Sequence, residues 1–126
     1  MEVDLTKGQA LQQFFSGFMT AYPSTSVPDD VVFPYLTYEV SFGTFGDGDQ
    51  SMTVNLWFYT DSEAIPNAKA KEFSELISRG GTIINCDEGA IWLKRGTPFC
   101  QSLSDDVSPN VKRRYINLDV EYLTNN

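Results

Sequence analysis

Three segments of this chain repeat with a strict period of two residues. They span residues 36–42, 52–59 and 116–122, and in each one every second residue is apolar. A period of two places alternate side chains on opposite faces of an extended chain, so each segment predicts a strand with one buried face. Such strands are typical of antiparallel or mixed sheets, because strands of buried parallel sheets are apolar on both faces.

An amphipathic helix is predicted near the N-terminus, between residues 4 and 19. Asp4 or Thr6 is expected to cap its first turn, since both side chains accept hydrogen bonds from backbone amides. Apolar side chains recur there at the i, i+3, i+4, i+7 and i+8 spacing of one helical face. They are Leu11, Phe14, Phe15, Phe18 and Met19.

A second helix is predicted over residues 62–78. Pro66 is tolerated only in a first turn, which places the start of this helix near it. Gly80-Gly81 is expected to end the helix, because glycine readily adopts the backbone angles of a helix terminus. The side chains expected to face the core are Ile65, Ala68, Phe73, Leu76 and Ile77.

The remaining segments are rich in turn-forming residues. Residues 21–32 contain two prolines among short polar side chains and predict an irregular connector. Residues 43–50 contain three glycines and predict the loop of a hairpin. Two short strands, over residues 82–86 and 90–95, are expected to be joined by a tight turn. Residues 96–109 are predicted to form a loop that leads into the last strand.

Together these elements predict a single α+β domain that spans residues 1–126. The sheet is expected to be mixed or mainly antiparallel, with about five strands and with two helices packed on one face. A chain of 126 residues with 41% apolar residues is long enough and apolar enough to bury a core without metals or crosslinks.

The charge and composition exclude several classes of function. A formal net charge of −8 argues against a general affinity for nucleic-acid phosphates or anionic lipids. The chain has no histidine, so it lacks the usual base of a serine or cysteine nucleophile and the usual zinc ligand sets. Cys86 and Cys100 are predicted to be reduced thiols. We therefore expect no enzymatic activity, no metal, no cofactor and no membrane span.

The glycine-rich loop is the first candidate site. A phosphate-binding loop is followed by a helix, whereas here a strand is expected to follow. Asp47 and Asp49 could suggest a calcium loop, but the spacing of an EF-hand and its last glutamate are missing. The loop around Asp47, Gly48 and Asp49 is interpreted as an exposed hairpin tip, which can dock onto a neighbouring subunit.

Large aromatic residues on the outer face of the strands form the second candidate site. The alternation places Trp57, Tyr59 and Tyr115 opposite the apolar face, and it places Trp92 likewise. Two interpretations remain open. The aromatic side chains form a surface that binds another protein, or a second covering element buries them as ordinary core.

Two basic pairs form the third candidate site. Lys94-Arg95 and Arg113-Arg114 are expected to be neighbours if their strands pair. Such charges either protect a sheet edge against uncontrolled pairing or form a patch that meets acidic residues of a neighbouring subunit.

Short motifs along most of the chain, from about residue 23 to residue 123, are arranged in a recognisable order. They are Pro34-Tyr35-Leu36-Thr37-Tyr38, Leu56-Trp57, Gly89-Ala90-Ile91-Trp92, Gly96-Thr97-Pro98-Phe99-Cys100-Gln101 and Lys112-Arg113-Arg114-Tyr115-Ile116-Asn117-Leu118. Their order and spacing resemble the tail-terminator, or tail-completion, proteins of long-tailed phages and prophages. The individual motifs include no catalytic residues.

This resemblance implies a virion protein that is made in the host cytoplasm and assembles with copies of itself into a hexameric ring. The ring would cap the major tail tube protein, stop tube polymerisation, and offer a surface to the head–tail connector and neck proteins. DNA would pass through it without sequence-specific binding. By analogy, the interface residues would be Asp47, Gly48, Asp49, Trp57, Tyr59, Lys94, Arg95, Arg113 and Tyr115. The alternatives are a neck or head-closure protein of the same virion and a small cytosolic domain that binds a ligand or peptide.

Overall fold

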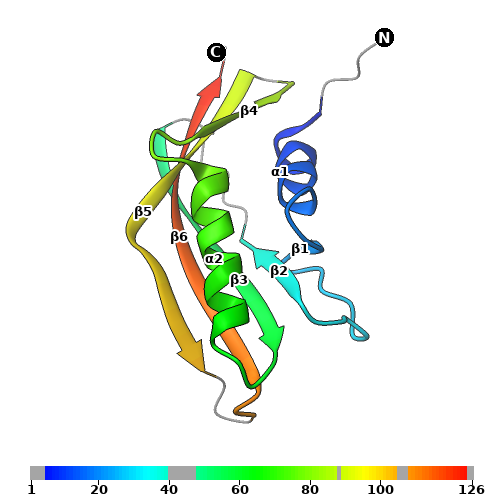
Figure 1. Ribbon diagram of the computed structural model, residues 1–126. Helices are drawn as coiled ribbons and strands as arrows, with labels where there is room; N and C mark the ends of the chain where they lie inside the picture. The colour runs from blue at the N-terminus through cyan, green and yellow to red at the C-terminus, as the bar shows by residue number, and fades with distance from the viewer. Residues whose placement is uncertain (1–4, 40–47, 88, 105–107, 125–126) are drawn as a thin grey trace.

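The computed structural model describes residues 5–39, 48–87, 89–104 and 108–124 (Figure 1). These residues form two helices and one six-stranded sheet. In chain order the elements are α1 (Lys7–Ser16), β1 (Ala21–Pro23), β2 (Tyr35–Tyr38), β3 (Gly48–Tyr59), α2 (Ala64–Ile77), β4 (Thr82–Cys86), β5 (Gly89–Ser104) and β6 (Val111–Thr124). The strands lie in the order β1-β2-β3-β6-β5-β4. All neighbouring pairs are antiparallel except β1 with β2, which are parallel.

The predicted α+β class is confirmed, but the sheet is mixed and has six strands instead of about five. The additional strand is β1, which lies in the segment predicted to be an irregular connector. It pairs with β2 over three residues, and the flanking backbone bonds join Leu36 N to Thr20 O and Ser24 N to Tyr38 O, each at 2.8 Å. Pro23 is compatible with this strand because β1 is an edge strand, where a missing amide costs no ladder bond on the outer side.

The second strand of the predicted hairpin begins earlier than expected. Gly48 and Asp49 belong to β3, where they pair with Tyr122 and Glu121 of β6. They are therefore not in a loop, and the prediction of a hairpin tip at these two residues is wrong. Pairing with the long β6 explains the difference, because each added residue of β3 gains a partner there. Asp47 lies outside the described residues.

The predicted loop over residues 96–109 is also wrong, because β5 continues to Ser104. The register with β6 shifts between Arg95 and Cys100, so the strand contains a bulge there and then resumes pairing. Gly96 permits this geometry: a Cβ at this position would lie 2.8 Å from the backbone oxygen of Asn117. Asn117 also donates a hydrogen bond from Nδ2 to the Pro98 oxygen at 2.8 Å, which holds the bulge against β6.

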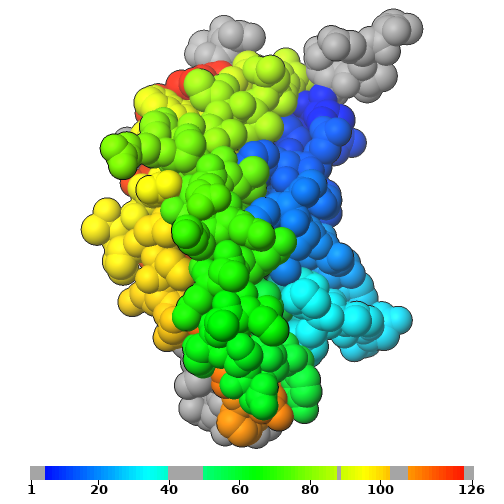
Figure 2. All heavy atoms as spheres, viewed as in Figure 1, coloured from blue at the N-terminus to red at the C-terminus, as the bar shows by residue number. Residues whose placement is uncertain are grey.

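Both helices cover the same face of the sheet, as predicted (Figure 1). Figure 2 shows this face, with α2 in green along the front and α1 in blue beside it. The core between helices and sheet contains Leu11 and Phe15 of α1 and Phe73 and Ile77 of α2, all fully buried. Helix α1 begins with a reciprocal capping box, in which the side chains of Thr6 and Gln9 each accept from the other's backbone amide.

Helix α2 buries a narrower stripe than predicted. Pro66 occupies its first turn, as expected, and is buried. Phe73 and Ile77 are inward as predicted, but Ile65 is 56% exposed and Ala68 is exposed as well. The buried positions 66, 73 and 77 define the face of the helix that contacts the sheet. Positions 65 and 68 lie off that face, so the apolar character of their side chains did not predict burial.

A buried arginine fastens the start of α2 to the sheet. Arg114 points to the helix-covered face and is only 2% exposed. Its Nη2 donates to Glu63 Oε2 at 2.7 Å and to Asn67 Oδ1 at 2.9 Å, and Lys112 Nζ lies 3.7 Å from the Glu63 carboxylate. The hydrogen bond from Arg114 lowers the pKa of Glu63 from its usual 4.5, and the positive charges of Arg114 and Lys112 add to this effect.

This arrangement predicts an acid-sensitive contribution to stability. Because the folded-state pKa of Glu63 is lowered, its contribution is present above pH 4.5 and is lost as the pH falls through the lower folded-state value. Thermal unfolding of the wild type and of Glu63→Gln, followed from pH 7 down to pH 3, should show a difference in Tm at pH 7 that shrinks below pH 4.5. A constant difference over this range would contradict the assignment.

Candidate functional site: the open face of the sheet

The face of the sheet opposite the helices is not covered by any helix or strand of the described residues (Figure 1). Side chains of alternate residues in β3 and β6 lie on it, among them Asn55, Trp57, Arg113 and Tyr115. The prediction that Trp57, Tyr59 and Tyr115 lie opposite the apolar face is therefore confirmed. We call this surface the open face.

Aromatic side chains form a continuous row across one end of the open face. The ring of Tyr35 stacks on Trp57 with centroids 6.0 Å apart, and it also contacts Tyr22 and Phe33 at 6.3 and 5.3 Å. Phe33 in turn contacts Tyr59 at 5.9 Å. We call these five residues the aromatic row. Edge-to-face and stacked contacts between aromatic rings stabilise a fold by more than the burial of their apolar area alone.

The aromatic row is fixed in place and still accessible. Trp57 donates from Nε1 to Thr37 Oγ1 at 2.9 Å, and the guanidinium of Arg113 lies 5.1 Å from the Trp57 ring centroid. Tyr59 remains 60% exposed, and Val32 beside Phe33 in the chain is 77% exposed. The segment between β1 and β2 that contains Val32 projects from the side of the molecule, cyan in Figure 2. Exposed apolar surface of this kind often marks a site of protein contact.

A polar hollow adjoins the aromatic row. It has a volume of about 210 Å³ and is lined by Ser24, Thr37, Tyr38, Glu39, Thr53, Asn55 and Tyr115. The hydroxyls of Thr53 and Tyr115 lie 3.4 Å apart, within hydrogen-bond distance. The Oδ1 atom of Asn55 is buried and has no hydrogen-bond partner among the described residues. An unsatisfied buried acceptor is unusual in a folded protein, because such atoms are normally paired with a protein group, an ordered water or an ion.

The opposite end of the open face is charged. Lys94 Nζ lies 3.4 Å from Glu121 Oε1 and 4.6 Å from the centroid of the Trp92 ring. Trp92 donates from Nε1 to the Gly80 oxygen at 3.0 Å, which ties the turn after α2 to this end. These side chains are partly exposed, so the ion pair contributes little to stability.

The two basic pairs do not come together as predicted. Strands β5 and β6 do pair, but Lys94 lies opposite Asp119, whereas Arg113 lies opposite Leu103, six residues along β6. The alternation also separates each pair between the two faces. Arg95 donates to the Ser74 oxygen of α2 at 2.7 Å and therefore lies on the helix-covered face. The four basic residues of the two pairs therefore do not form one patch.

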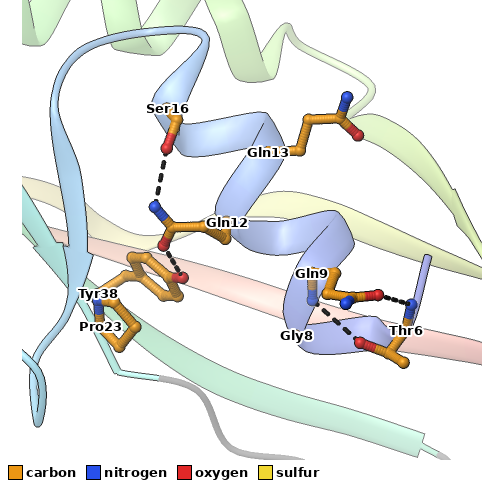
Figure 3. Close-up of a pocket in the computed structure, with 8 residues that line it drawn as sticks. All are labelled: Thr6, Gly8, Gln9, Gln12, Gln13, Ser16, Pro23 and Tyr38. Atoms are coloured by element: carbon orange, nitrogen blue, oxygen red, sulfur yellow. Dashed lines mark hydrogen bonds between the residues drawn. The ribbon is translucent and has the colours of Figure 1, made fainter.

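A second concave surface lies on the other side of the molecule, between α1 and the β1–β2 strands (Figure 3). Its volume is about 710 Å³, and its lining residues are Thr6, Gly8, Gln9, Gln12, Gln13, Ser16, Pro23 and Tyr38. Gln12 spans it, donating to Ser16 Oγ and the Ala21 oxygen and accepting from the Tyr38 hydroxyl. Among the described lining residues the one ionisable side chain is the Tyr38 phenol, whose pKa is raised by burial.

Among the described residues that line the two concave surfaces, Glu39 is the one carboxylate and no cysteine is present. Across the described ranges, no cluster of three or more histidine, cysteine, aspartate or glutamate side chains is arranged to hold a metal ion. Among the same residues, neither helix has the length and apolar character needed to cross a bilayer. Burial raises the pKa of the Cys100 thiol, which makes it less nucleophilic at neutral pH.

The sequence indicated part of this site. Tyr22 was not predicted to join Trp57 and Tyr59, because β1 was not expected. Phe33 and Tyr35 were not predicted to join them because they precede the alternating segment that begins at residue 36. The polar hollow was not predicted at all, since its residues come from three strands and two connecting segments. Comparison of the chain with family models, with curated proteins and with solved structures finds no match.

Proposed function

We propose that this chain is a phage tail terminator, a structural subunit that assembles as a ring on the end of the tail tube and stops its growth. The proposal begins from the ordered motifs that resemble this family. The observation that supports it best is the aromatic row, which presents partly exposed rings on an uncovered sheet face. Interfaces between proteins are enriched in such aromatic side chains, with arginine beside them.

The rigidity of the aromatic row favours binding. Trp57 is held by its bond to Thr37 and by Arg113, so little side-chain entropy is lost when a partner covers the ring. The rest of the open face is polar and suits the rim of an interface. In a ring of identical subunits, a contact between two different surfaces repeats around the circle and closes when its rotation divides the full turn.

Tyr59→Ser is expected to weaken capping of the tube strongly without unfolding the protein. Tyr59 is 60% exposed, so its loss removes contact area for a partner while costing the core little. The measurement is the length distribution of tubes formed by the major tail tube protein, observed by electron microscopy with each variant added. The wild type should give capped tubes of limited length, and Tyr59→Ser should give long, uncapped tubes.

Ile65→Ser is the matched control, because Ile65 is similarly exposed, at 56%, but belongs to α2 on the other face. It should cap as the wild type does. If the wild type neither binds tube ends nor limits tube length, the proposal fails. If Ile65→Ser and Tyr59→Ser are equally defective, capping does not use the aromatic row.

A further inference from the structure

The described residues that line the polar hollow carry several hydrogen-bond acceptors and no positive charge. Asn55 Oδ1 is buried without a partner, and Glu39 forms no ion pair with any described residue. The hydroxyls of Ser24 and Tyr115 add acceptors along the wall. A buried acceptor without a donor costs free energy, which a ligand that supplies the donor recovers. The hollow is thus complementary to a cationic group with several N–H donors.

A guanidinium group fits these acceptors better than the other common cations. Calcium takes six to eight oxygen ligands and magnesium a strict octahedron of them, whereas Glu39 is the one carboxylate among the described residues that line the hollow. A lysine ammonium is a compact charge with three donors, whereas an arginine side chain spreads five donors over a planar group. The acceptors here are distributed over a hollow of about 210 Å³, much larger than one water molecule.

Within the part of the chain that the structure describes, one arginine has no partner and is available for such a contact. All four of its arginines are described, and three are engaged within the chain: Arg95 with the Ser74 oxygen, Arg113 with the Trp57 ring and Arg114 with Glu63. Arg79 is exposed and has no partner among the described residues.

Arg79 and the hollow lie toward opposite edges of the sheet. Arg79 follows α2 and directly precedes Gly80, whose oxygen accepts from Trp92 at the β4 side of the open face. The hollow is formed by residues of β2, β3 and β6, by Glu39 directly after β2, and by Ser24, which follows β1 at the other edge. A contact that joins opposite edges of two identical subunits is heterologous, and such contacts can close into rings.

We propose that the polar hollow of one subunit binds the guanidinium of Arg79 from a second copy of this chain. This inference rests on the proposed ring and describes the interface between its subunits. In that interface Arg79 donates to Asn55 Oδ1 and forms an ion pair with Glu39. The aromatic row next to the hollow extends the same interface with apolar area.

The first experiment measures self-association by sedimentation velocity over a range of protein concentrations. Arg79→Glu and Glu39→Arg are each expected to weaken self-association about tenfold or more, because each places like charges together. The double variant, which exchanges the two charges, should recover association. Lys71→Glu is the matched control, since Lys71 is an exposed cation of α2 without a partner among the described residues. It should associate as the wild type does.

The second experiment tests the hollow directly and does not depend on assembly. Labelled Arg79→Glu protein is titrated with N-acetyl-arginine methylamide, and the Asn55 side-chain amide is followed by NMR. Saturable shifts at Asn55 and Thr53 in the millimolar range are expected, with much weaker shifts from the lysine analogue. Equal shifts with both probes, or none, would overturn the proposal.

A wild type that stays monomeric at all concentrations, or an Arg79→Glu variant that associates as the wild type does, would also overturn it. Neither experiment uses the tail tube protein. Failure of tube capping with intact self-association would therefore count against the proposed function and leave this contact standing.

Discussion

Replacing Phe73 with alanine is expected to lower the free energy of unfolding by about 3–5 kcal/mol. Phe73 is fully buried and lies where both helices meet the sheet. Its ring contacts Phe15 of α1 at 6.3 Å, Phe18 at 5.2 Å and Phe99 of β5 at 6.5 Å. Truncation would remove all three ring contacts and leave a cavity that the surrounding strands cannot close.

Urea unfolding followed by circular dichroism measures this change as a shift in the midpoint at constant slope. Lys71→Ala on the exposed side of the same helix is the control and should change stability by less than about 0.5 kcal/mol. A loss below about 1 kcal/mol for Phe73→Ala would mean that α2 is not fastened to the sheet through this ring.

Replacing Arg114 with alanine is expected to cost about 2–4 kcal/mol, because it removes a buried side chain together with its bonds to Asn67 and Glu63. Arg114→Met separates the two causes, since methionine retains most of the buried apolar length but none of the charge. This variant leaves Glu63 and Asn67 without their donor, but Glu63 is 60% exposed and can be solvated, so Arg114→Met should cost about 1–2 kcal/mol and less than Arg114→Ala.

The measurement is again urea unfolding, with Arg113→Ala as the matched control. Arg113 precedes Arg114 in β6 but contacts Trp57 on the open face, so its loss should cost less than about 1 kcal/mol. If Arg114→Met is as unstable as Arg114→Ala, the charged hydrogen bonds and not the packing hold the start of α2.

The strands and helices with long, regular patterns were predictable. The alternation over residues 116–122 identified half of β6, which spans Val111–Thr124, and both helices were placed with their central residues correct. Local pattern suffices for these elements because one face of each is buried over many residues. The helix ends were also predictable where they depend on local chemistry, as with Thr6 at the start of α1.

Elements that depend on a distant partner were not predictable. Strand β1 has three residues and a proline, and it is a strand only because β2 lies beside it. The second half of β5 follows a glycine, a threonine and a proline that indicate a loop, yet it pairs with β6 as far as Ser104. In both cases backbone hydrogen bonds to another strand outweigh weak local preference.

The amino-acid sequence by itself determined that this chain forms a sheet with one apolar face, covered by two helices, and that aromatic residues lie on the other face. Its period-two and helical patterns are local and directly encode which side of each element is buried. Only the tertiary structure decided which aromatic residues meet in a row, that Asn55 Oδ1 is buried without a donor, and that Arg79 has no partner among the described residues. These properties depend on strand order and register, which bring together residues that are far apart in the sequence.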